Sequence, residues 1–184
     1  SCSSLTSITL PESLTTIGYD AFSRCSMTSI TLPKSLTSIG TGAFSDCSNL
    51  TNITIPDGVT TIETSTFENC SSLTGITIPD GVTTIETSTF SGCSSLTSIT
   101  LPESLTTLGY DAFSGCSSLT SFSGKYASSD HRCLVVGGKL VAFAPSGLTT
   151  YSIPDDVTTI GEWAFESCSS LTSITLPESL TTIG

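Results

Sequence analysis

The chain has 184 residues, of which 37% are hydrophobic and 11% are charged, and sixteen acidic against five basic residues give a formal net charge of −11. Nucleic acids and anionic membranes are bound through basic patches, so we expect neither as a partner. No run approaches the ~18 apolar residues of a transmembrane helix, so we expect no membrane insertion, and the N-terminus carries no secretory signal.

A 23-residue repeat organises the chain. Residues 96–118 read LTSITLPESLTTLGYDAFSGCSS, and related copies begin at Leu5, Met27, Leu50, Leu73, Leu148 and Leu171. A fixed period of this length predicts a solenoid, in which each repeat is one coil stacked on the next. We therefore predict one domain over 1–184, with regular repeats in 5–118 and 148–184 and an irregular repeat in 119–147. Because the chain begins and ends within a repeat, we expect a segment of a longer protein.

Each repeat opens with a predicted strand. In the copy at 96–118, Ile99 and Leu101 alternate with polar residues, the period of a strand with one buried face, and Pro102 ends it because proline donates no hydrogen bond to a ladder. A second short extended segment follows at 105–108, and Gly109 turns the chain in this copy, as glycine does in most others. At ~4.8 Å per coil, about eight coils would make a stack about 40 Å long.

The outward positions of the first strand form a hydroxyl face almost without charge or aromatic residues. We interpret it as a surface for weak, multivalent contact with glycans or extended proteins; an ice-binding face and simple β-propensity are the alternatives. Its members are Ser7, Thr9, Ser29, Thr31, Asn52, Thr54, Gly75, Thr77, Ser98, Thr100, Ser121, Ser123, Thr150, Ser152, Ser173 and Thr175.

The end of each repeat predicts a single helical turn, at 110–116 in this copy. Ala112, Phe113 and Cys116 would share its inner face. The phenylalanine recurs as a column of buried plugs: Phe22, Phe44, Phe67, Phe90, Phe113 and Phe165. The cysteine recurs likewise, as Cys2, Cys25, Cys47, Cys70, Cys93, Cys116 and Cys168. One cysteine per coil is not a zinc spacing; the column is either a row of buried thiols or a ladder of disulfides between neighbouring coils.

The pattern L-x-x-I-x-(L/I)-P-x-x-(L/V)-x-x-I-G-x-x-A-F-x-x-C resembles the BspA-like leucine-rich repeats over essentially the whole chain. The resemblance implies a right-handed leucine-rich repeat solenoid, with a parallel β-sheet on one side and short extended segments and single helical turns on the other. It also implies a cell-surface or secreted protein that adheres to host or cell-surface proteins or glycans. Three N-x-S/T sequons, at Asn49, Asn52 and Asn69, would matter only in a glycosylating secretory pathway.

The irregular repeat at 119–147 predicts an inserted β-hairpin. Two β-rich runs flank Gly137 and Gly138, a strong hairpin signal. Pairing across that turn sets Val136 opposite Lys139, Val135 opposite Leu140 and Leu134 opposite Val141. The segment holds three of the five basic residues and the only histidine, so it is the chemically diverse part of the chain. It is either a binding lip or a bridge between the two halves of the stack.

We expect no enzyme. Asp130 and His131 are adjacent in sequence, and no nucleophile motif, metal-ligand spacing or cofactor motif accompanies them. We predict a binding or adhesion module, with a structural spacer and an enzyme-attached recognition module as alternatives. Trp163 joins the insert as a contact because tryptophan is enriched among interface hot spots, and Tyr19 and Tyr110 are also expected near the surface. The candidate partner-binding residues are Tyr126, Asp130, His131, Arg132, Lys139 and Trp163.

Overall fold

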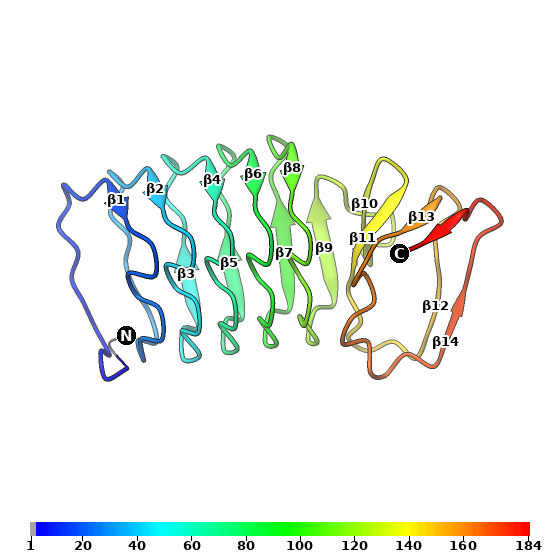
Figure 1. The fold of residues 1–184 in the computed structure, drawn as a ribbon, viewed down its shortest axis with the longest axis horizontal. Coiled ribbons are helices and arrows are strands. Elements are labelled where there is room, and N and C mark those ends of the chain that lie inside the picture. Colours follow the sequence, from blue (N-terminus) through cyan, green and yellow to red (C-terminus); the bar gives the residue numbers. More distant parts are fainter. Residues whose placement is uncertain (1–2) are drawn as a thin grey trace.

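The computed structural model describes residues 3–184 as a solenoid of about seven turns, one fewer than we predicted from the sequence (Figure 1). The first strand of the repeat forms a row of strands that pair in parallel only two by two, in three separate sheets. Its strands are β3 (Asn52–Thr54), β5 (Gly75–Thr77), β7 (Ser98–Leu101), β9 (Ser121–Gly124), β12 (Thr150–Ser152) and β14 (Ser173–Thr175). In the second copy the segment contributes only a bridge between Ser29 and Asn52.

The second extended segment forms another row of strands along the upper edge of the view (Figure 1). The row comprises β1 (Thr16–Ile17), β2 (Ser38–Ile39), β4 (Thr61–Ile62), β6 (Thr84–Ile85) and β8 (Thr107–Leu108), and, beyond the insert, β13 (Thr159–Ile160) and β15 (Thr182–Ile183). Strands of this row pair in parallel within three groups, β1 with β2, β4 with β6 and β8, and β13 with β15. Within a group each residue lies beside its equivalent in the next coil, as Ile62 lies beside Ile85.

Threonine hydroxyls add a second set of bonds between coils. Thr74 Oγ1 donates to the Thr51 carbonyl at 3.2 Å, and Thr97 Oγ1 donates to the Thr74 carbonyl at 3.4 Å. Each of these carbonyls lies one coil back along the stack. The threonine column before the strand thus extends the hydrogen-bond ladder in addition to supplying β-propensity.

The predicted helical turn is wrong: no helix occurs among residues 3–184, and successive tight turns take its place. In the first coil the Ser23 amide donates to the Asp20 carbonyl three residues back, at 3.1 Å, while the Phe22 amide donates to Ala43 in the next coil, at 2.8 Å. Alternate amides therefore leave the coil and cannot close i to i−4 bonds. Asp20 and Arg24 also have φ of 52° and 59°, which a right-handed helix does not allow.

The phenylalanine column fills the interior as predicted. Phe44, Phe67 and Phe90 are completely buried, and their rings stack with centroids 5.6 Å apart. The core falls into two hydrophobic clusters that meet at the insert: one runs from Ile17 to Ala144, and the other contains Cys133, Leu140, Phe143 and the coils after it.

The cysteine column consists of free thiols, which settles the alternative of a disulfide ladder for the described residues. Cys70 Sγ donates to the Phe44 carbonyl and Cys93 Sγ to the Phe67 carbonyl, both at 3.2 Å. Each thiol thus satisfies a backbone carbonyl of the preceding coil instead of bonding to the neighbouring sulfur. Cys2 lies outside the described residues.

The insert forms the predicted hairpin from β10 (Cys133–Val136) and β11 (Lys139–Phe143). Val136 pairs with Lys139 and Val135 with Leu140, as expected, but Leu134 pairs with Ala142 and not with Val141. A β-bulge accounts for the shift, because Val141 is an extra residue on the second strand. Strand β11 also pairs in parallel with β13, so the hairpin replaces the second strand of a coil.

Candidate binding site at the seam

The hydrogen-bond ladder between coils is interrupted where the coil at 96–118 meets the hairpin β10–β11, a junction we call the seam. In the regular stack the Ile85 carbonyl accepts the Gly109 amide at 2.7 Å, and the Thr83 carbonyl accepts the Thr107 amide at 3.1 Å. The equivalent carbonyls of β8 belong to Leu108 and Thr106. Among residues 3–184, no backbone or side-chain donor outside the β6–β8 pair bonds to either carbonyl.

The ladder is also interrupted on the turn side of the seam. The Ser88 amide donates to the Tyr110 carbonyl and the Phe90 amide to the Ala112 carbonyl, both at 2.9 Å. The equivalent amides one coil further on, those of Asp111 and Phe113, find no carbonyl acceptor across the seam in the described part of the chain. The Asp111 Oδ1 atom is likewise buried without a hydrogen-bond partner. Burial raises the pKa of this carboxyl, and the charge of Glu162 raises it further.

A cavity of about 390 Å³, the seam cleft, occupies this break. Charged side chains enter it from both sides, because Glu86 belongs to the regular coils whereas Lys139 and Glu162 follow the break. The Lys139 ammonium lies 5.5 Å from the centroid of the Tyr110 ring, within cation–π range. The lining residues are Glu86, Thr87, Thr107, Leu108, Gly109, Tyr110, Val136, Lys139, Val141, Gly161 and Glu162.

Two large aromatic side chains are exposed beside the seam. Tyr110 is 69% exposed and Trp163 is 60% exposed, as the sequence predicted. Trp163 adjoins a much smaller space, whose lining shares Val141 with the seam cleft. Trp163 has a φ of 60°, and the residues at the same repeat position have φ values within about 10° of it, such as 54° at Ser65 and 55° at Ser88. The coil turn therefore fixes the direction in which the indole leaves the stack.

Other predicted site residues lie at the opposite end of the hairpin and hold it in place. The Asp130 carboxylate accepts hydrogen bonds from the Ser128 hydroxyl, from the Arg132 amide at 3.0 Å and from the Tyr151 hydroxyl at 2.8 Å. Partial burial alone would raise the pKa of Asp130, but these three bonds, together with one from its own backbone amide, outweigh it and lower the pKa. Tyr151 also contacts Cys133 Sγ at 3.1 Å, and burial raises the pKa of that thiol to about 12.

His131, Arg132 and Tyr126 likewise bond to backbone carbonyls. His131 Nδ1 lies 3.0 Å from the Phe122 carbonyl, and Arg132 Nη1 donates to the carbonyls of Ala144 and Ser146 at 3.3 and 2.9 Å. The Tyr126 hydroxyl donates to a carbonyl of the preceding coil at 3.2 Å. The structure thus gathers Lys139 and Trp163 near the seam cleft and separates them from Tyr126, Asp130, His131 and Arg132.

Sequence reasoning did not assign Glu86, Tyr110 or Glu162 to the site. Two features of the sequence set these residues apart. Glu86 stands where most repeats have glycine, and Tyr110 shares a repeat position with Glu162. Only the fold reveals that the insert leaves a gap beside these residues.

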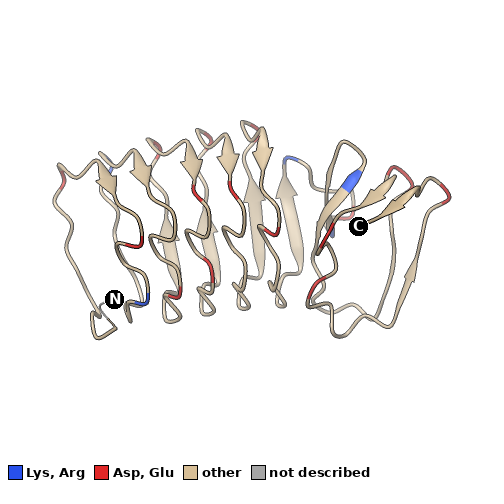
Figure 2. Cartoon of the chain, in the orientation of Figure 1, with Lys and Arg blue, Asp and Glu red and all other residues tan. Residues whose placement is uncertain are grey.

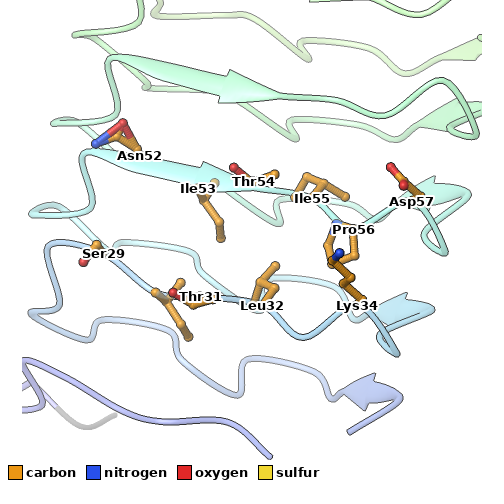
Figure 3. Close-up of a pocket in the computed structure, with 11 residues that line it drawn as sticks. Ser29, Thr31, Leu32, Lys34, Asn52, Ile53, Thr54, Ile55, Pro56 and Asp57 are labelled. Carbon is orange, nitrogen blue, oxygen red and sulfur yellow. The ribbon is translucent and has the colours of Figure 1, made fainter. Parts of the chain in front are cut away.

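A second hollow lies on the hydroxyl face (Figure 3). It has a volume of about 530 Å³ and extends from Ser29 to Asp57, and an adjoining space of about 330 Å³ continues over β3, β5 and β7. Lys34 lines it and stands in a repeat column that is otherwise acidic: Glu12, Asp57, Asp80, Glu103, Asp155 and Glu178. Gly75 leaves a dent in this face, because no atom lies within 4 Å of where its Cβ would be.

Acidic positions are dispersed along the stack, whereas basic positions are few (Figure 2). Within residues 3–184, one ion pair occurs, between Arg24 and Asp46 at 3.2 Å. Over the same range no group of three or more His, Cys, Asp or Glu side chains is placed to hold a metal ion. The described residues also contain no helix of the length and hydropathy that a membrane span requires.

Comparison with known proteins identifies the repeat. The model of the BspA type leucine rich repeat region matches residues 1–125 and 139–184 in six copies, and the unmatched residues fall in the insert. No curated protein matches significantly.

Solved structures of bacterial leucine-rich repeat proteins share the fold. One from Bacteroides ovatus is 32% identical with a TM-score of 0.71, over 93% of this chain and 43% of its own. A leucine rich cell surface protein from Faecalibacterium prausnitzii is 26% identical with a TM-score of 0.68, over 93% of this chain and 61% of its own. The T. pallidum leucine-rich repeat protein is 29% identical with a TM-score of 0.62, over 92% of this chain and 67% of its own. The chain thus spans between 43% and 67% of these proteins, and it belongs to the BspA-type leucine-rich repeat family.

Proposed function

We propose that this chain is a non-catalytic binding module of a cell-surface or secreted protein, and that it attaches to other proteins through the seam. The observation that carries the proposal is the group of Tyr110, Lys139 and Trp163 beside the seam cleft. Exposed aromatic side chains next to a cavity are the usual anchors of protein interfaces. The hydroxyl face offers no such anchor.

The surroundings support the proposal in two further ways. Asp130 and Arg132 fix the hairpin through hydrogen bonds to neighbouring segments, so Lys139 is presented from a rigid strand. The relative from Faecalibacterium prausnitzii is described as a cell surface protein, which agrees with an adhesive role at a surface.

An array of extracellular-matrix proteins and host glycans, probed with the purified chain, tests this function. The seam variant carries Tyr110→Ser and Trp163→Ser. The matched control is Tyr19→Ser, because Tyr19 has the same repeat position as Tyr110 and is 73% exposed but lies in the first coil. We expect the seam variant to lose at least about tenfold in affinity, since hot-spot truncations cost about 2 kcal/mol or more, and we expect the control to bind normally.

A third variant, Thr54→Ala with Thr77→Ala, alters the hydroxyl face. Binding that this variant loses and the seam variant keeps would move the contact to that face and refute the proposed site. Binding by none of the proteins would favour a structural spacer that holds another domain away from the cell.

A further inference from the structure

We propose that the seam cleft takes up one extended peptide segment of a partner protein, which pairs in parallel with β8 and carries at least one basic side chain. This inference rests on the proposed binding function and adds its mode and the chemistry of the ligand. It follows from three observations: unpaired backbone groups, the width of the gap, and the charges that line it.

The unpaired backbone groups have the geometry of a sheet edge. Thr106 and Leu108 present carbonyls whose equivalents at Thr83 and Ile85 accept amides of the next coil. A free strand edge of this kind is a template for another strand, because its acceptors already point in the ladder direction. The ligand they require is therefore a backbone with donors at every second residue.

The gap is wider than one strand spacing. Every Cα–Cα distance between β8 and either strand of the hairpin exceeds 8 Å, whereas neighbouring strands in a sheet lie about 4.8 Å apart. An inserted strand needs about two such spacings, or roughly 9.6 Å. The cavity of about 390 Å³ also falls within the ~300–1,000 Å³ typical of ligand pockets. The gap between β8 and the hairpin thus exceeds one strand spacing, and its volume suits a single extended segment.

The lining charges favour a basic occupant. Glu86 and Glu162 line the cleft from opposite sides of the seam, and Lys139 is the one cation among the lining residues. The Lys139 ammonium is also near the Tyr110 ring, which stabilises it in that position. The whole chain has a net charge of −11, so long-range attraction also favours a cationic segment.

The probe is the synthetic peptide acetyl-KLTTIK-amide, whose central residues copy the second extended segment of a regular coil, the LTTI of residues 14–17. Two control peptides isolate the two parts of the proposal. Acetyl-ELTTIE-amide reverses the charge, and a version with N-methylated Thr-Thr-Ile amides removes the backbone donors. We expect each control to bind at least about tenfold more weakly by fluorescence anisotropy, since each loses charge attraction or hydrogen bonds.

A protein variant completes the test. Glu86→Lys with Glu162→Lys should reverse the preference, so that the acidic peptide binds more tightly than the basic one. Both residues are at least partly exposed, so we expect the melting curve to stay unchanged, and NMR shifts should centre on residues 106–110.

Three results would overturn the inference. They are no measurable binding of the basic peptide, equal affinity of the N-methylated peptide, and shifts centred on the hydroxyl face. None of these would contradict the proposed function if the array partner still depended on Tyr110 and Trp163. Loss of that dependence would instead refute the proposed function itself.

Discussion

Removing one ring from the middle of the phenylalanine column should destabilise the stack far more than removing one at its end. Phe67 is completely buried, and its ring is nearly parallel to those of Phe44 and Phe90, with interplanar angles of 3° and 5°. Phe67→Ala leaves a cavity and removes both stacking contacts. Substitutions of this kind cost about 3–5 kcal/mol, and each aromatic pair contributes about 0.5–1.5 kcal/mol of that cost. We therefore expect a loss of about 4–5 kcal/mol in the free energy of unfolding.

Phe22→Ala is the matched control, because Phe22 is only partly buried and stacks with Phe44 alone. We expect it to cost about half as much. Urea titration followed by circular dichroism measures both losses. The thermal midpoint of Phe67→Ala should fall by roughly 8–20 °C for a chain of this length. Equal losses for the two variants would refute the view that the stacked rings form one continuous core.

Three further predictions concern pH, the hairpin and the backbone. Burial raises the pKa of the Cys47 thiol from its ordinary value of 9.0 to about 11, so the unfolded chain loses this proton at a lower pH than the folded chain. The free energy of unfolding should therefore be constant below pH 9 and fall as the pH rises toward 11. Cys47→Ala should reduce the slope of this fall in alkaline urea titrations. Asp130→Ala should cost about 1–3 kcal/mol at pH 7, because it leaves the hydrogen-bond donors of Asp130 unsatisfied. Since the pKa of Asp130 is lowered, this difference in stability from the wild type should disappear as the pH falls through that pKa. Gly124→Ala should cost at least about 2 kcal/mol in the same assay, because Gly124 has a φ of 78° and an added Cβ would collide with the Leu101 carbonyl oxygen. The control Gly75→Ala should be tolerated, because no atom lies within 4 Å of the added Cβ. Equal costs for the two variants would show that the backbone around Gly124 relaxes.

Repetition made much of the fold predictable. Because Phe67 and Cys70 recur at a fixed spacing, their burial could be inferred from the pattern alone, and the structure places both in the core. The local turn could not be inferred in the same way. The spacing of Ala112, Phe113 and Cys116 suits a helical turn equally well, and only the structure excludes it, through the amide bonds between coils and the positive φ angles in the turns.

The candidate site was harder to predict because it depends on contacts between distant segments. The bulge at Val141 changes the hairpin register, and nothing in the alternation of apolar residues reveals it. The bonds from Tyr151 to Asp130 and Cys133 join residues 18 and 21 positions apart across the insert. The seam cleft arises because the hairpin does not pair with β8. Such an absence of pairing has no signature in a single sequence.

The direction of the hydrogen bonds between coils determines how the molecule responds to tension. These bonds run along the stack, so a pull on its two ends loads them one coil at a time, as in a zipper, instead of shearing many together. Each coil that opens releases 23 residues, which extend to roughly 76–83 Å at about 3.3–3.6 Å per residue, against about 4.8 Å when stacked. The seam, which lacks part of its ladder, should open first. A tether built from such coils would lengthen in steps under load and recover when the load is removed.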